Sequence, residues 1–68
     1  MELIEYDGCR ANVSISFDEL VILNNALNEV CNGLDQFDFE TRIGAKHEEV
    51  VTLFKSIGLC LDKLENVE

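Results

Sequence analysis

The residues best suited to chemistry are a single histidine and the two acids beside it. His47 is followed directly by Glu48 and Glu49. A hydrolase or transferase needs a nucleophile, a base and a group that holds developing charge, all meeting in one cleft. The sequence offers no assignable Ser-His-Asp, Cys-His or paired-carboxylate arrangement, and no glycine-rich phosphate loop or dinucleotide fingerprint. We therefore expect a protein that is not an enzyme and has no cofactor, and we interpret His47 as a solvated residue at the start of a helix.

The sulfur chemistry is equally limited, because three cysteines stand far apart in the chain: Cys9, Cys31 and Cys60. A secreted domain of this size usually carries an even set of cysteines that forms disulfides. Zinc needs about four ligands, and three scattered cysteines with one histidine do not supply them. We expect reduced, buried thiols in a cytoplasmic protein, and no metal site.

The chain is acidic throughout, with a formal net charge of −9 over 68 residues. Residues 1–33 hold six acids and one base, and residues 34–68 hold eight acids and four bases. Such a field repels phosphate backbones and anionic membranes, which argues against nucleic-acid and membrane partners. It attracts a basic protein surface and accelerates the encounter. Solubility is the alternative explanation of the same charge.

Length and hydropathy indicate a single small globular domain over residues 1–68. The longest apolar run, Leu20 to Leu23, is far too short to span a membrane. The first five residues carry two acids and no base, unlike a secretory signal. We therefore expect the protein to remain in the cytoplasm.

Two short strands are expected at the start of the chain, over residues 3–6 and 11–16. Asp7-Gly8 between them is a strong hairpin signal. Every second residue from the start of the second strand is apolar, which places these side chains on one face. A tight turn and a four-residue loop both add Ile4 and Tyr6 to that face, and the sequence leaves the exact register open.

The clearest local signal is a capping box at Ser16-Phe17-Asp18-Glu19. It predicts a helix from Phe17 to about Cys31, ended by Gly33 in the left-handed conformation. An apolar stripe at the helical period is expected to cover the apolar face of the hairpin, since a hairpin alone is marginal in water. The stripe contains Leu20, Leu23, Leu27, Val30 and Cys31.

The segment from Leu34 to Gly44 allows two interpretations. Residues 37, 39, 41 and 43 alternate as in a strand, whereas Asp38 is a good helix cap and Gly44 a plausible stop. We favour a short helical turn over residues 36–43 rather than a third strand.

A second main helix is expected from near Lys46 to about Leu64, with Glu48 and Glu49 in the first turn, where the helix dipole favours acids. Gly58 is a point at which this helix could bend or end. Its apolar stripe contains Val50, Leu53, Phe54, Ile57, Leu61 and Leu64. The expected fold is thus α+β, with an N-terminal β-hairpin packed on two main α-helices and a short helical turn between them.

Both main helices carry an apolar residue on the face opposite the stripe. Ile22 is ringed by acids and amides, which is the composition of an interface with an apolar anchor and a polar rim. Leu59 lies similarly away from the core on the last helix. The candidate partner-binding residues are Asp18, Ile22, Asn25, Glu29, Asn32, Val51, Lys55 and Leu59. A homodimer through these faces or through the open hairpin edge, and exposed residues without a role, remain alternatives.

The segment Phe39 to Phe54, with Arg42-Ile43-Gly44-Ala45-Lys46-His47-Glu48-Glu49-Val50 at its corner, resembles the helix-turn-helix of bacterial regulators. In that family the first turn of the second helix reads base edges in DNA. Here Glu48 and Glu49 would face phosphates. A helix-turn-helix DNA binder is therefore the least favoured function.

Larger parts of the chain share a second resemblance. They are Ser16-Phe17-Asp18-Glu19-Leu20, Asn24-Asn25-Ala26-Leu27-Asn28-Glu29-Val30-Cys31-Asn32-Gly33, Phe39-Glu40-Thr41-Arg42-Ile43-Gly44 and Glu48-Glu49-Val50. Together they resemble small bacterial immunity proteins of contact-dependent inhibition and other polymorphic toxin systems. The resemblance implies a protein that binds a toxin domain, often a basic nuclease, and blocks its active site or substrate surface.

The sequence thus favours an acidic inhibitor that neutralises a cognate bacterial toxin by direct, electrostatically steered binding. A phage-encoded inhibitor of a nucleic-acid enzyme would have the same properties. A small homodimeric structural or regulatory protein is the alternative from a different class.

Overall fold

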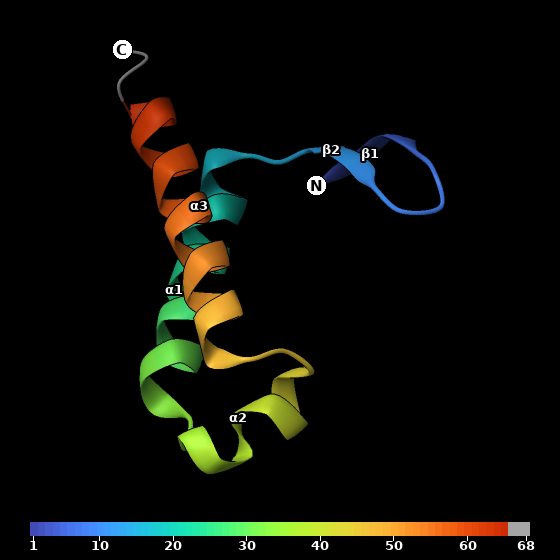
Figure 1. The fold of residues 1–68 in the computed structure, drawn as a ribbon. Coiled ribbons are helices and arrows are strands. Elements are labelled where there is room, and N and C mark those ends of the chain that lie inside the picture. The colour runs from blue at the N-terminus through green and yellow to red at the C-terminus, as the bar shows by residue number, and fades with distance from the viewer. Residues whose placement is uncertain (66–68) are drawn as a thin grey trace.

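The computed structural model describes residues 1–65 and contains a two-stranded hairpin followed by three helices (Figure 1). The elements are β1 (Glu2–Tyr6), β2 (Ala11–Ser14), α1 (Phe17–Gly33), α2 (Gln36–Ile43) and α3 (His47–Glu65). The predicted α+β class is confirmed, as are the N-terminal hairpin, the two main helices and the short helical element between them.

The hairpin is antiparallel, with Leu3 opposite Val13 and Tyr6 opposite Ala11. A register irregularity lies between Leu3 and Glu5, so that Ile4 has no partner in the ladder. The expectation that Ile4 shares a face with Tyr6 is therefore wrong. The extra residue reverses the alternation within β1, and Leu3 takes the place that Ile4 was predicted to hold.

The turn of the hairpin is the four-residue loop from Asp7 to Arg10. The Asp7 carboxylate accepts hydrogen bonds from the backbone N–H groups of Cys9 (2.7 Å) and Arg10 (2.8 Å). These two bonds lower the pKa of Asp7, because they stabilise the charged form. An aspartate at this position can hold the loop through its own side chain, which explains the strong turn signal of Asp7-Gly8.

The capping box at the start of α1 is confirmed. The Ser16 hydroxyl accepts from the Glu19 amide at 3.1 Å, and the Glu19 carboxylate accepts from the Ser16 amide at 3.0 Å. The predicted end of the helix is wrong, since Gly33 is the last residue of α1 and Leu34 caps it in an extended conformation. In residues 1–65 a positive φ occurs at Gly44 and not at Gly33.

The segment that allowed two interpretations is a helix, as we favoured. Asp35, and not Asp38, caps α2, accepting a hydrogen bond from the Phe37 amide at 3.0 Å. Gly44 ends α2 with φ of 81° and donates its N–H to the Glu40 carbonyl at 2.8 Å. This left-handed conformation is the one in which glycine has an advantage over other residues.

The core lies between the helices. Helices α1 and α3 run antiparallel and pack side by side, and α2 contacts α3 at the far end of the pair from the hairpin (Figure 1). Among the residues whose burial the structure describes, the buried hydrophobic ones are Leu20, Phe39 and Val50, with Phe39 fully buried. α3 continues through Gly58 without ending there.

His47 belongs to this core and is not the solvated residue that we expected. Its Nε2 donates to the carbonyl oxygen of Cys31 at 2.9 Å, and its ring meets the Phe39 ring edge-on at a centroid distance of 5.0 Å. His47 thereby links the end of α1 to the start of α3 and covers the buried Phe39.

The hairpin does not pack on the helices, in contrast to the expected arrangement. It projects sideways from the N-terminal end of α1 (Figure 1). Within residues 1–65 neither strand packs against a helix, and every residue of β1 and β2 is exposed. The physical reason is that the α1 stripe faces α3, since Leu20 is 4% exposed and lies on the helix pair. A single stripe cannot cover both elements.

Candidate partner-binding surface

Among residues 1–65 no group of three or more histidine, cysteine or acidic side chains is placed to hold a metal ion. No helix within the same range is long and apolar enough to cross a membrane.

The three cysteines are free, and Cys31 is half-buried. Cys9 and Cys60 are exposed, which contradicts the expectation of buried thiols. Cys9 lies in the hairpin loop and Cys60 lies outside the apolar stripe of α3, so neither reaches the thin core.

The outward face of α1 carries five of the candidate residues, and all five are exposed: Asp18, Ile22, Asn25, Glu29 and Asn32. The helical repeat places them three and four positions apart on one side of the helix. Ile22 is 67% exposed and is the apolar member of this set. The Asn32 amide nitrogen already donates to the backbone and side-chain oxygens of Asn28, both at 2.9 Å. Of the two amides in this set, Asn32 therefore has less capacity than Asn25 to donate to a partner.

Ile22 lines an apolar hollow of about 260 Å³, which we call the Ile22 hollow. Its lining residues are Met1, Ile15, Glu19, Ile22 and Leu23. The first turns of α1 supply three of these side chains, and the chain entering α1 supplies Ile15. The capping box fixes the angle of that entry, so the hollow depends on a local signal that the sequence already shows.

Glu19 is the charged residue of the hollow. Its carboxylate pairs with the amino group of Met1, which brings the start of the chain back to α1. This hydrogen bond to the amino group, followed by the bond from the Ser16 amide, lowers the pKa of Glu19 to about 2. Glu19 is therefore ionised at neutral pH and holds the Met1 amino group at the edge of an apolar surface.

The charged side chains of α1 have one sign, although Glu19 at the hollow is paired with the Met1 amino group. All charged side chains of α1 are acidic: Asp18, Glu19 and Glu29. Asp18 lies one turn before Ile22 and Glu29 two turns after it on the same side of the helix. An apolar hollow between carboxylates suits an apolar side chain presented from a basic surface.

The three candidates on α3 do not join this site. Leu59 is 65% exposed and Lys55 is exposed, whereas Val51 is half-buried. None of the three lines the Ile22 hollow. Of the α1 candidates, Ile22 lines the hollow and the other four do not, and the structure does not bring the α3 candidates to it. The assignment of these residues to a partner-binding surface stays a prediction.

Sequence reasoning missed several residues of this surface. Ile15 and Leu23 were assigned to the core, yet both line the hollow, and Leu23 is 40% exposed. Outside the hollow, sequence reasoning also left Phe37 on α2 in an ambiguous segment, and this side chain is 92% exposed. A phenylalanine two positions from the buried Phe39 faces away from it in a helix but with it in a strand. Only the choice between these two structures could have identified Phe37 as a surface residue.

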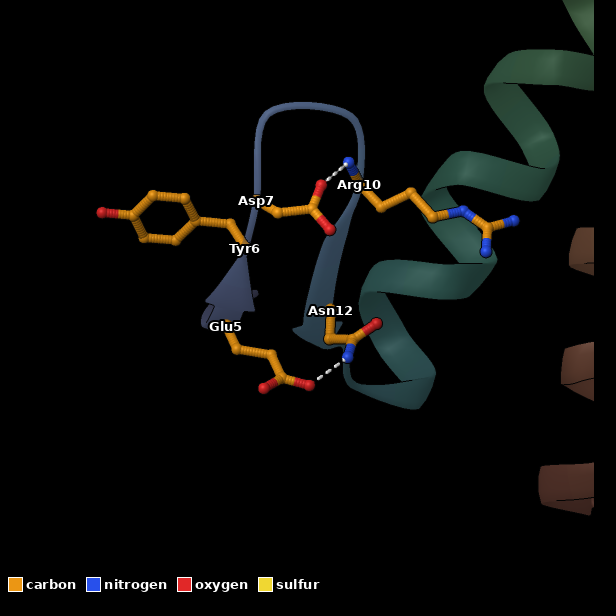
Figure 2. Close-up of a pocket in the computed structure, with 5 residues that line it drawn as sticks. All are labelled: Glu5, Tyr6, Asp7, Arg10 and Asn12. Atoms are coloured by element: carbon orange, nitrogen blue, oxygen red, sulfur yellow. Dashed lines mark hydrogen bonds between the residues drawn. The ribbon is translucent and has the colours of Figure 1, made fainter.

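A second hollow, of about 330 Å³, lies on the hairpin and is polar (Figure 2). Its lining residues are Glu5, Tyr6, Asp7, Arg10 and Asn12. Glu5 already accepts from the Asn12 amide at 2.6 Å, and Asp7 holds the turn. The Arg10 guanidinium points away from the Asp7 carboxylate (Figure 2). Because the acids bond within the hairpin and the one cation turns away from them, we do not assign a ligand to this hollow.

Comparisons with protein-family models, with curated proteins and with solved structures find no match to this chain. The resemblance to immunity proteins stays a prediction.

Proposed function

We propose that this protein is a non-catalytic inhibitor that binds a basic protein domain through the Ile22 hollow of α1. The observation that carries the proposal is the combination of a highly exposed Ile22 in an apolar hollow with a helix whose charged residues are all acidic.

The apolar part of the surface supplies affinity. Burying an isoleucine side chain contributes about 1.5–3 kcal/mol, and Ile22 has most of its surface still to bury. Interfaces obtain most of their binding energy from a few such anchors in desolvated pockets. Ile22, with Met1 and Leu23 beside it, would form one half of such a contact.

The acidic residues raise the rate of association and select for a basic partner. A chain of net charge −9 attracts a basic surface before contact, and this steering raises association rates. Asp18 and Glu29 would then meet lysine or arginine side chains around the apolar anchor. The same charges disfavour nucleic acid and anionic membranes as partners.

In its most specific form, the proposal is that the partner is a bacterial toxin domain, in particular a nuclease, which this protein neutralises in the cytoplasm. The sequence resemblance to immunity proteins and the acidity of the chain support this form. A toxin that acts on nucleic acid presents a basic substrate surface, which an acidic inhibitor can cover.

The proposal is tested by affinity capture from the host lysate with wild-type protein and two matched variants. Ile22→Asp and Leu59→Asp place the same charge at positions of nearly equal exposure, 67% and 65%, on α1 and α3. We expect both variants to remain folded by circular dichroism, Leu59→Asp to retain a basic partner and Ile22→Asp to lose it. Equal retention by the folded Ile22→Asp variant would refute the Ile22 hollow as the binding site.

The toxin form is tested with the captured partner itself. We expect expression of the partner alone to stop growth and co-expression of this protein to restore it. Co-expression with Ile22→Asp should fail to restore growth. A partner that is harmless when expressed alone would refute toxin neutralisation while leaving protein binding in place.

A further inference from the structure

Among the paired residues of the hairpin, apolar side chains lie on one face and polar side chains on the other, whereas the unpaired Ile4 is not on the apolar face. Directly paired residues of an antiparallel sheet point to the same side, and successive residues of a strand to opposite sides. The pairs Leu3–Val13 and Tyr6–Ala11 therefore share one face. The opposite face carries Glu2, Glu5, Asn12 and Ser14, with the Glu5–Asn12 hydrogen bond of 2.6 Å across it.

The irregularity at Ile4 produces this separation. In a regular strand Leu3 would share a face with Glu5, and Tyr6 with Glu2. The additional residue instead brings Leu3 and Tyr6 to one side and both acids to the other. The result is a sheet with an uncharged apolar face, in a chain that is acidic elsewhere.

Nothing else in the described part of the chain covers this apolar face. Leu3 is 55% exposed, Tyr6 75% and Val13 42%. The hairpin projects away from the helix pair (Figure 1). A two-stranded hairpin by itself is marginally stable in water, so its formation requires a covering surface.

The whole molecule exposes more surface than a compact monomer of its mass, and the hairpin contributes to this excess together with the Ile22 hollow and Phe37. Its accessible surface is 5652 Å², against about 4,300 Å² expected for a globular monomer of this mass. The excess of about 1,300 Å² is more than the roughly 800 Å² that each partner buries in a standard interface. The radius of gyration of 13.7 Å likewise exceeds the value of about 11 Å expected for a compact chain of this length.

We propose that the apolar face of the hairpin is covered by the same face of a second copy of this chain, in a two-fold symmetric dimer. The hairpin is stable only when this face is covered, so the covering surface must be present whenever the chain folds. A second copy of the chain meets that condition without any other protein. The face is also uncharged, so it does not select a basic partner. Glu2 and Glu5 point outward when two such faces stack, which keeps like charges apart.

This dimer is distinct from the proposed inhibition, because no residue of β1 or β2 lines the Ile22 hollow, although Met1 and Ile15 beside the strands do. Each dimer would carry two Ile22 hollows.

The test uses the purified chain in a reducing buffer, because Cys9 and Cys60 are exposed. Sedimentation equilibrium at tens of micromolar protein should give twice the chain mass of 7.7 kDa. The double variant Tyr6→Thr/Val13→Thr keeps strand-forming residues but removes the apolar area, and should be monomeric. Glu5→Thr on the opposite face and Ile22→Asp on α1 are the matched controls, and both should remain dimeric.

A second readout needs no substitution. Tyr6 is the sole tyrosine and the chain has no tryptophan, so intrinsic fluorescence reports on this face alone. Acrylamide quenching of Tyr6 should decrease as protein concentration rises through the dimerisation range. A monomeric wild type, a dimeric Tyr6→Thr/Val13→Thr variant, or a dimer in which Tyr6 stays fully quenchable would each overturn the proposal, as would a hairpin covered solely by a different protein.

The homodimer and the complex with a basic partner should respond differently to salt. Added salt screens the repulsion between two chains of charge −9, so the dimer should persist or tighten at high ionic strength. A dimer that dissociates in high salt would contradict an apolar, uncharged contact.

Discussion

At the scale of single residues, the start of α1 is the best-determined part of the molecule. Ser16 and Glu19 exchange the two hydrogen bonds that their spacing predicts, and the same turn positions Glu19 and Ile22 in the hollow. The partner of the remaining Glu19 oxygen, the amino group of Met1, could not be predicted. Its position depends on the path of the hairpin, which no local pattern in the sequence specifies.

Replacing the cap should cost stability without altering the fold. Ser16→Ala removes the oxygen that accepts from the Glu19 amide and should lower the free energy of unfolding by about 1 kcal/mol. Ser16→Asp supplies an equivalent acceptor and should lose much less. Urea unfolding, at one protein concentration for all variants, measures both. Equal losses in the two variants would show that the cap contributes nothing.

Glu19 should make the stability of the protein depend on pH in the acidic range. Its pKa is lowered to about 2 in the folded protein, against about 4.3 in an unfolded chain. Its contribution is therefore fully present above about pH 4.3 and is lost as the pH falls towards 2. We expect Glu19→Gln to be less stable than the wild type at pH 7 and to approach it near pH 2. A stability difference that is constant over this range would contradict the lowered pKa.

His47 should act as a structural link between helices. Its Nε2 donates to the Cys31 carbonyl, so His47→Leu leaves that oxygen without this donor and should cost about 1 kcal/mol. His47→Gln can still donate from its amide and should cost less. Thermal or urea unfolding of the two variants measures the difference, and equal stability of His47→Leu and wild type would refute the link.

At the scale of elements, caps and apolar stripes predicted the helices well. The C-terminal ends of the helices were harder to predict, because a glycine permits a left-handed helix end but does not require one. Gly44 adopts it and Gly33 does not. The packing of the stripes was also undetermined by the sequence. The α1 stripe could meet the hairpin or α3, and nothing local decides between two apolar partners.

Two glycines, Gly44 at the end of α2 and Gly58 inside α3, should respond to alanine substitution with opposite changes in stability. Gly44→Ala forces a side chain into a left-handed conformation and should cost about 1–2 kcal/mol. Gly58→Ala lies inside α3, where an added Cβ meets no atom within 4 Å, and should gain up to about 1 kcal/mol. Urea unfolding measures both. A stabilising Gly44→Ala would contradict the αL cap, and a destabilising Gly58→Ala would contradict the continuous helix.

At the scale of the whole molecule, the protein has more surface than its small core requires. In the described part of the chain the buried core consists of Leu20, Phe39 and Val50, while the hairpin, the Ile22 hollow and Phe37 present apolar groups to solvent. Composition predicted one acidic domain and a candidate anchor at Ile22. It could not predict the detached hairpin, because tertiary packing decides which apolar faces remain uncovered.

The acidity of the molecule is central to the proposed function, and it makes a kinetic prediction. We expect the association rate with the captured basic partner to fall at least about tenfold as ionic strength rises from low to high. Glu29→Lys reverses a charge two turns from Ile22 and should slow association at low salt, with the difference from wild type disappearing at high salt.

The most direct measurement is therefore the association rate of wild type and Glu29→Lys with that partner across a salt series. A steep decline for the wild type, with the two proteins converging at high salt, is the result that electrostatic steering to an acidic α1 predicts. Association rates that change neither with salt nor with the charge at position 29 would contradict it.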